Sequence, residues 1–351
     1  MSRWWAQAGR WPVGRAILAA LVVSLLACGT PFTSSPLPEA SQVPVGDRDL
    51  YGVAWLRDGT VVVTFAPERD DTLARLGTVD LASGEIDELP LPPNQGCRGQ
   101  HAREPTPLPD GRLGLLYVCE QDDPGHNASI EAFDRQSRRF ERLFGLESIW
   151  VSSGPYTVSP DLQWAVIAHG GLICEGLARF SRSGPDPLPV TISDEGRSFR
   201  LDTPVDGAGK CADTGRAHFP TWSPDGRTIA FFGSPASIGR SGQSRLDADW
   251  NVYLLDATDL SPRPGLRGVH NARGLRWSPD GMRLAFAGQI GEQKGTWTVN
   301  PVDNVPPLIS STDLDWLAWS PDGTQIVGAK SYVSAAGDLS SRLFLIPVPA
   351  P

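Results

Sequence analysis

The stretch Trp222-Ser-Pro-Asp-Gly226, followed by RTIAFFG, decides the fold, because it occurs twice more in nearly the same form. The other copies are Trp277-Ser-Pro-Asp-Gly281 with MRLAFAG and Trp319-Ser-Pro-Asp-Gly323 with TQIVGAK. Proline presets φ for a type I turn, aspartate caps the turn, and glycine takes the left-handed position that follows. The alternating apolar run after each turn predicts a β-strand, and the apolar residues before it predict another. Each copy therefore predicts a β-hairpin.

Three weaker copies extend the repeat toward the amino terminus. They are Trp55-Leu-Arg-Asp-Gly59 before TVVVTFA, Pro109-Asp110-Gly111 before RLGLLYV, and Ser159-Pro160-Asp161 before LQWAVIA. The repeated aspartates are Asp58, Asp110, Asp161, Asp225, Asp280 and Asp322. Most units carry one further short β-type run, and a fourth, weaker strand would complete each unit. Six units of four strands predict an all-β fold, a six-bladed β-propeller of four-stranded blades.

This W-S-P-D-G-x-x-I-A-F pattern resembles the blade motif of the TolB-type, WD-repeat-like propeller family. The resemblance covers roughly residues 46–349, and we expect residues 46–351 to form the propeller domain. It implies the fold but no single activity, because propellers include scaffolds, binding proteins and enzymes. The last unit ends one strand short, so we expect residues 42–50 to supply the outer strand of the sixth blade. Members of this family can carry a further domain before the propeller, and we expect no room for one here.

The amino terminus has the pattern of an export signal. Residues 1–27 carry three arginines and no acid, and they end in a 12-residue apolar run. A membrane-spanning helix needs roughly 20 apolar residues, so the run fits the core of a signal peptide. It ends in Leu25-Leu26-Ala27-Cys28-Gly29, which resembles the lipobox of bacterial lipoproteins. We therefore expect a lipoprotein signal peptide over 1–27, an acylated Cys28, a Pro/Ser-rich tether over 28–45, and an extracytoplasmic location. An ordinary secretory signal is the alternative.

The remaining cysteines agree with export. Four cysteines follow Cys28, and an even number in an exported chain suggests two disulfides. Three pairings are possible. We favour Cys97–Cys119 and Cys174–Cys211, because each pair is close in sequence. Metal ligation is the alternative, and no C-x-x-C spacing supports it.

The candidate site follows from the expected topology. The first strand of each blade lines the central channel, so the residues before that strand surround one mouth. They read GQHAREPT, TGRAHFPT and GVHNARGL in three blades. The candidate ligand-binding residues are His101, Arg103, His169, Arg216, His218, His270, Arg273, Asp313 and Asp315, with Arg48 and Asp49 offered by the first blade. We interpret the six motif aspartates as structural, because the turn itself needs them.

These residues support two functional hypotheses. Histidine, arginine and aspartate at a mouth suit an anionic ligand or an acidic partner segment. Alternatively, three histidines and a carboxylate would hold a transition metal. The plain alternative is that they only solvate a water-filled channel. The first hypothesis predicts a non-enzymatic, lipid-anchored, monomeric module that binds a protein partner or a small anionic ligand, with no cofactor.

The second hypothesis predicts a metal-dependent propeller enzyme, a lyase or a lactonase-like hydrolase, acting on acidic carbohydrate or related small molecules. A structural scaffold that binds through blade edges is a third possibility. No G-x-S-x-G, H-E-x-x-H or P-loop motif is present. The net charge of −9 argues against a nucleic-acid partner, because such proteins carry a basic surface. Contact with a membrane is expected only through the lipid anchor.

Overall fold

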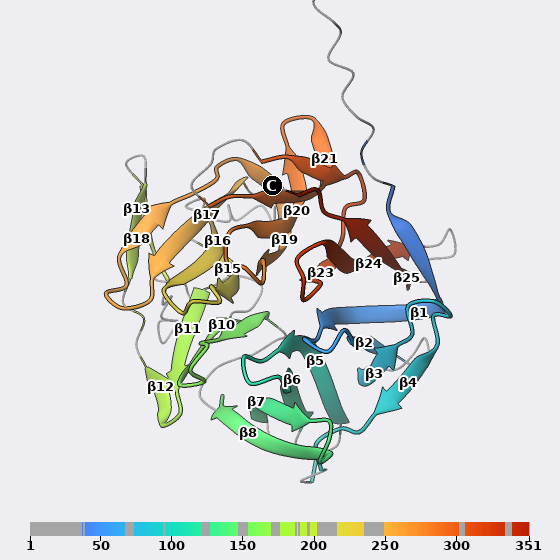
Figure 1. Cartoon of the computed structure of the whole chain (residues 1–351). Helices are drawn as coiled ribbons and strands as arrows, with labels where there is room; N and C mark the ends of the chain where they lie inside the picture. Colours follow the sequence, from blue (N-terminus) through green and yellow to red (C-terminus); the bar gives the residue numbers. More distant parts are fainter. Residues whose placement is uncertain are drawn as a thin grey trace, which may run out of the picture. The chain divides into compact units, whose positions relative to one another are not determined.

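The computed structural model describes the chain from Leu37 onward, with gaps. The described residues are 37, 39–66, 74–93, 96–97, 99–120, 127–146, 154–169, 176–186, 188, 190–194, 197–201, 216–234, 249–301, 306–333 and 339–350. In this part of the chain every regular element is a β-strand (Figure 1). None of it forms a helix that would be long and apolar enough to cross a membrane. The expected signal peptide, Cys28 and the first part of the tether lie outside these residues.

The strands pair in antiparallel sheets that follow the order of the sequence. Blade 1 contains β1 (Ser41–Trp55), β2 (Val61–Ala66), β3 (Arg75–Val79) and β4 (Ile86–Leu89). Blade 2 contains β5 (Gly99–Pro107), β6 (Leu113–Glu120), β7 (Asn127–Asp134) and β8 (Arg139–Gly145). Blade 3 contains β9 (Tyr156–Val158), β10 (Trp164–His169), β11 (Gly176–Ser181) and β12 (Gly184–Asp186).

The second half of the chain repeats this arrangement after a separate hairpin, β13 (Thr191–Asp194) and β14 (Arg197–Arg200). Blade 4 contains β15 (Arg216–Trp222), β16 (Thr228–Ser234), β17 (Asp249–Asp256) and β18 (Pro262–Pro264). Blade 5 contains β19 (Val269–Trp277), β20 (Leu284–Ile290), β21 (Gln293–Val299) and β22 (Leu308–Ser310). Blade 6 contains β23 (Trp316–Trp319), β24 (Gln325–Val333) and β25 (Leu339–Pro347).

The fourth strand of blade 6 comes from the other end of the chain. The first residues of β1 pair with β25, with Ser41 opposite Leu345 and Val43 opposite Leu343. The rest of β1 pairs with β2 in blade 1. The expectation that a segment near residues 42–50 completes the last blade is confirmed. The strand begins at Ser41, so residues 41–45, predicted as the end of the tether, are part of a sheet whose backbone groups they help to satisfy.

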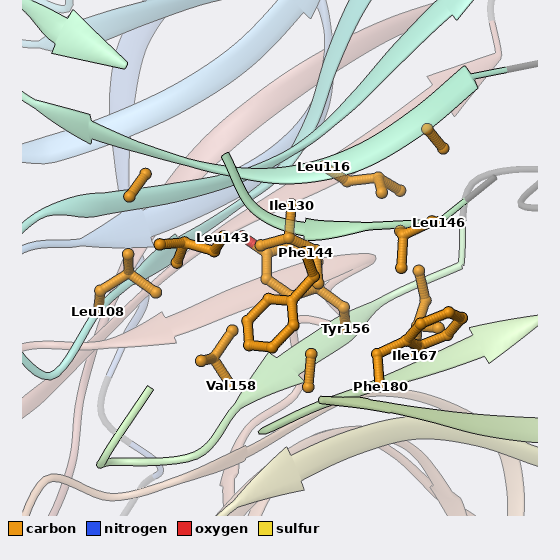
Figure 2. Packing of buried hydrophobic residues seen from close by; sticks show 13 residues of the cluster. Leu108, Leu116, Ile130, Leu143, Phe144, Leu146, Tyr156, Val158, Ile167 and Phe180 are labelled. Carbon is orange, nitrogen blue, oxygen red and sulfur yellow. The ribbon is translucent and has the colours of Figure 1, made fainter. Parts of the chain in front are cut away.

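The hydrophobic core lies between the blades. Figure 2 shows the layer between blades 2 and 3, where Leu116, Ile130 and Phe144 pack against Tyr156 and Phe180. Equivalent buried clusters join blade 1 to 2, 3 to 4, 4 to 5, 5 to 6, and 6 to 1. Each sheet is therefore covered on both faces by its neighbours, which a single blade could not achieve. The predicted all-β propeller of four-stranded blades is confirmed.

The motif turns show why the aspartate recurs. Ser223 donates its hydroxyl to Asp225 Oδ1 at 2.6 Å, and the backbone N–H of Arg227 donates to the same oxygen at 3.0 Å. The hydroxyl oxygen of Ser223 also accepts the backbone N–H of Thr228. The turns at Asp280 and Asp322 have the same bonds. These contacts hold the hairpin connection and explain the repeat without any catalytic role.

Neighbouring inner strands are joined by hydrogen bonds from the motif. The Trp277 indole N–H donates to the carbonyl of Thr221 at 3.1 Å, and the Trp319 indole N–H donates to the carbonyl of Arg276 at 3.2 Å. The backbone N–H of Trp222 donates to the hydroxyl of Thr157 in the preceding blade. The tryptophans therefore connect blades as well as filling the space between them.

A disulfide joins Cys97 and Cys119, as predicted, with 5.2 Å between their Cα atoms. It ties the segment before β5 to the end of β6 in blade 2. The second predicted pair, Cys174 and Cys211, lies outside the described residues.

Candidate functional site

The mouth is the end of the ring at which the inner strands begin, opposite the motif turns. Figure 1 shows β1, β5, β15, β19 and β23 nearest the centre of the ring. Successive inner strands contact one another from β9 through β15, β19, β23 and β1 to β5. The predicted residues lie on these strands or just before them. His101 and Arg103 are on β5, Arg216 and His218 on β15, His270 and Arg273 on β19, and Asp313 and Asp315 directly before β23, whereas His169 ends β10.

Three of the predicted residues come together in one network. Arg273 Nη2 lies 2.5 Å from Asp313 Oδ2, and its Nη1 pairs with Asp315 Oδ1. The backbone N–H of Ser331 donates to the other oxygen of Asp315 at 2.7 Å. Arg273, Asp313 and Asp315 are all largely buried, so these charges interact with little screening by water.

Two lysines that sequence reasoning missed complete this network. Lys294 Nζ is 3.0 Å from Asp313 Oδ2, and Lys330 Nζ is 3.3 Å from the same oxygen. They lie on β21 and β24, not on an inner strand, so a search restricted to inner strands passes over them. With Arg273 they give three cations to two carboxylates. The network is thus positive in a chain whose net charge is −9.

The histidines do not join that network. His270 Nδ1 lies 2.8 Å from Asp249 Oδ1 in blade 4, and both side chains are exposed. His101 is buried, whereas His218 is half-buried with its ring centroid 4.4 Å from that of Phe219. His169 is half-buried at the end of β10. Among the residues that the structure describes, no three His, Cys, Asp or Glu side chains gather as a metal would require.

Bulges re-aim side chains along the inner strands. The pairing register shifts within β1, β5, β15 and β19. Glu104 and Phe219, each six residues before its motif aspartate, have φ near 50°, and Gly274 at the same place in blade 5 has φ 64°. A left-handed φ strains a residue other than glycine, and such strain is concentrated at functional sites. A bulge of this kind changes the direction of the side chains beside it.

A second charged pair, which sequence analysis did not find, crosses the ring. Arg276 Nη2 of blade 5 lies 3.5 Å from Glu104 Oε2 of blade 2. Two blades separate these blades on either side, so the pair joins opposite sides of the ring. Burial raises the pKa of the Glu104 carboxyl, while Arg276 and a hydrogen bond from Trp316 act to lower it. Burial also lowers the pKa of Arg276, which Glu104 opposes.

A third feature lies where blades 1 and 2 meet. A Cβ added at Gly52 would lie 2.6 Å from Pro105 Cδ, so β1 and β5 approach closely there. Burial raises the pKa of the Tyr51 phenol, Asp49 raises it further, and Arg103 lowers it.

Comparisons with known proteins give the fold and no more. No protein-family model matches the chain, and no curated protein is significantly similar to it. Oligogalacturonate lyase from Vibrio parahaemolyticus is 12% identical, with a TM-score of 0.51 over 90% of this chain and 95% of the lyase. The calcium-binding protein regucalcin from Agrobacterium tumefaciens is 13% identical, with a TM-score of 0.50 over 89% and 96%. TolB from Acinetobacter baumannii is 16% identical, with a TM-score of 0.48.

The alignment with TolB covers 86% of this chain and 63% of TolB, so the chain spans less than two thirds of the TolB structure. The structural neighbours are propellers that differ in function. At these identities they show a propeller fold for this chain, and no substrate or partner passes from them to it.

Proposed function

We propose that this chain is a lipid-anchored, extracytoplasmic, six-bladed propeller that binds a protein partner or a small anionic ligand at the mouth of its ring. The proposal rests chiefly on the network around Arg273. This network places three cations against two buried carboxylates at the mouth. Structural stability alone would be served as well by an apolar contact, because buried ion pairs recover little more than their desolvation cost.

One oxygen of the network supports a binding role. Asp313 Oδ2 accepts from three cations, whereas Asp313 Oδ1 is buried and has no hydrogen-bond partner among the described residues. Nε of Arg273 is likewise buried and has no hydrogen-bond partner among the described residues. Buried polar atoms in folded proteins are nearly always paired, and a functional role is one explanation for an exception. The network therefore has hydrogen-bonding capacity that the described residues leave unused.

Two further observations support the proposed location. The Cys97–Cys119 disulfide is stable in an oxidising compartment. The run that ends in Ala27-Cys28-Gly29 supplies the signal and the acylation site. Both are consistent with a chain that acts outside the cytoplasm.

The alternative of a metal-dependent enzyme has less support in the described part of the chain. Its expected ligands, His101, His218 and His270, lie on three different inner strands, and His270 pairs with Asp249. No specific observation favours that function, and we do not propose it.

A photo-crosslinking residue placed at either end of the ring tests the proposal. Gln293 is exposed beside the network at the mouth, and Met282 is 62% exposed at a motif turn of the same blade. In cells, we expect a crosslink to one defined species from position 293 and none from 282. The variant R273Q should weaken that crosslink, whereas R263Q, at an exposed arginine on β18, should leave it unchanged. Crosslinks from position 282 alone would contradict the proposal.

A further inference from the structure

The hairpin formed by β24 and β25 extends past its neighbouring strands at the mouth end of blade 6. β23 pairs with β24 only as far as Ala329, and β1 pairs with β25 only as far as Ser341. The two hairpin strands continue together to the pair formed by Val333 and Leu339. Residues 334–338, which connect them, lie outside the described residues. The last pairs of the hairpin therefore have no further strand beside them in the part of the chain that the structure describes.

Large apolar side chains are exposed on these last pairs. Three of the five large apolar side chains that are exposed in the described part of the chain lie here, and Val333 is the most exposed of them at 69%. Val333 and Leu339 are directly opposite each other in the ladder, so their side chains lie on the same face. Tyr332 lies on the other face. Apolar residues that gather in this way are informative, because contiguous exposed apolar patches mark interaction sites.

Two cations lie directly opposite each other on the same hairpin. Lys330 on β24 pairs in register with Arg342 on β25. Side chains at opposite positions of an antiparallel ladder are close together, and like charges there repel each other. Lys330 Nζ reaches Asp313 at 3.3 Å, whereas the exposed Arg342 guanidinium stacks over the Tyr332 ring, 4.8 Å from its centroid. A stacked guanidinium still presents the N–H donors at its edge, so Arg342 can receive a carboxylate.

The hairpin adds to the positive charge of the mouth network. Arg342, opposite Lys330, brings the number of cations there to four, against the two carboxylates Asp313 and Asp315. The whole chain has a net charge of −9, so this positive area is local. Charge complementarity selects an acidic partner for it. Tyrosine and arginine, which form the stacked pair here, are enriched where proteins bind each other.

A lipid surface fits these residues less well than a protein does. Segments that recognise anionic lipids typically carry a cluster of about four to eight lysines and arginines. Here Asp313 and Asp315 offset part of a charge of that size. An anionic membrane would also repel a chain whose net charge is −9. The observations therefore favour a protein partner.

We propose that the end of the β24–β25 hairpin docks the protein partner, and that it takes an acidic segment of that partner which also carries apolar side chains. Arg342 and Lys330 face the carboxylates of the segment, whereas Tyr332, Val333 and Leu339 cover its apolar side chains. This inference rests on the proposed function and adds the docking surface and the chemistry of the partner to it.

Fluorescence anisotropy of three labelled peptides with the full-length chain in detergent tests the inference. The first peptide has a Leu-Phe pair with two glutamates on each side, the second has lysines in place of the glutamates, and the third has Ser-Gly in place of Leu-Phe. We expect the first to bind, the second to bind at least about tenfold more weakly, and the third at least about threefold more weakly. Absence of binding by the first peptide, or equal binding by either of the others, overturns the inference.

Variants locate the binding surface. V333S/L339S should weaken binding of the first peptide about tenfold and R342Q about threefold, because each removes one of the two kinds of contact. The matched controls are M282S, at an exposed methionine of a motif turn, and R263Q, at an exposed arginine of β18, and both should leave the affinity unchanged. All these positions are exposed, so we expect unchanged melting temperatures. Hairpin variants that bind the peptide as tightly as the parent would contradict the inference.

A photo-crosslinking residue at position 339 separates the other occupants of the hairpin end. In cells, we expect an adduct with a protein other than this chain, and R342Q should reduce its yield. A lipid adduct would identify a membrane surface, and an adduct between two copies of the chain would identify self-association. Either of these results, or no adduct, would overturn the inference.

The two proposals fail in different ways. If the crosslink from position 293 persists in V333S/L339S while the first peptide fails to bind the parent, the mouth binds its partner without the hairpin end. If the crosslink from position 293 is itself absent in the parent, binding at the mouth is wrong.

Discussion

The two ends of the ring differ in how closely their residues repeat from blade to blade. At the turn end, blades 4, 5 and 6 carry the same serine, aspartate and backbone hydrogen bonds at the same positions. At the mouth end, the residues seven positions before the motif aspartate are of five different types in the six blades, and only arginine occurs twice. They are Tyr51, Arg103, Gly154, His218, Arg273 and Asp315.

This contrast separates what the fold needs from what it leaves free. Only a few residue types suit a given turn conformation, so the same residues recur wherever the backbone has the same shape. The mouth side chains are not needed to hold a turn conformation. Their variety allows the blades to contribute different groups to an asymmetric site. The two ends should therefore respond differently to mutation.

The largest effect on stability is expected at the axis, between the two ends. R276M leaves the buried Glu104 carboxyl without its guanidinium and should lower the free energy of unfolding by about 3–5 kcal/mol at neutral pH. Because the folded-state pKa of Glu104 is raised, its ionisation costs stability as the pH rises through that pKa. The variant should therefore be closer to the parent at about pH 4 than at about pH 7.

Urea unfolding at both pH values measures this difference, and the double variant E104L/R276M should recover much of the loss. Equal stability of R276M and the parent at neutral pH would mean that the pair does not tie opposite blades together.

In blade 2, a disulfide reinforces the mouth end. The Cys97–Cys119 disulfide closes a segment with a sequence separation of 22, and its removal in C97A/C119A should cost about 3 kcal/mol. The measurement is denaturant unfolding of the parent with and without reductant, beside the double variant. The reduced parent should match C97A/C119A. A parent that is equally stable when fully reduced would contradict the prediction.

The turn end should respond identically wherever its motif is intact. Ser223, Ser278 and Ser320 are all buried and make the same bonds, so each serine-to-alanine variant should cost about 1–2 kcal/mol. Chemical unfolding of S223A, S278A and S320A gives three values that we expect to agree within about 0.5 kcal/mol. Values that differ by more than the average itself would weaken the contrast between a uniform and a varied end.

As the pH falls, we expect the fold to lose stability first at the turn end. Hydrogen bonds from Ser320 and Thr324 lower the pKa of Asp322 to about 2, and the pKa values of Asp225 and Asp280 are also lowered. A carboxyl with a lowered folded-state pKa stabilises the fold above its unfolded pKa, and that contribution is lost as the pH falls toward the folded value. Melting temperatures should thus decline between about pH 4 and about pH 2. In S320A, an NMR titration should find the pKa of Asp322 raised.

The smallest stability effect is expected for an exposed member of the mouth. Lys294 is 51% exposed, so K294Q should change the free energy of unfolding by less than about 0.5 kcal/mol. The same variant should reduce the mouth crosslink, because it removes the outermost cation of the network. A variant that loses stability while keeping the crosslink would reverse the roles assigned to the two ends.

The turn end was predictable from the sequence because its signal is local. Trp222 to Gly226 contains every residue that its turn needs, and the missing strand of blade 6 followed from counting strands. The Arg273 network was found in part, since Arg273 lies on an inner strand and Asp313 and Asp315 lie directly before another.

The axis pair was not predictable by the same route. Glu104 and Arg276 are 172 positions apart in the sequence, and their contact depends on which blades face each other across the ring. The bulge at Glu104 also changes the direction of its side chain, which a strict alternation of strand residues does not anticipate. Lys294 and Lys330 reach the mouth from second and third strands, where lysine is an ordinary surface residue.

The strand β1 belongs to two sheets, and this has a mechanical consequence. Its first residues hold the last strand of the chain, so a pull applied on the amino-terminal side of Ser41 loads the seam that shuts the ring. A proteolytic cut between Val43 and Leu50 would release blade 6 from blade 1 while leaving every other seam intact. Tags and fusion partners therefore belong before Ser41, where they leave that seam closed.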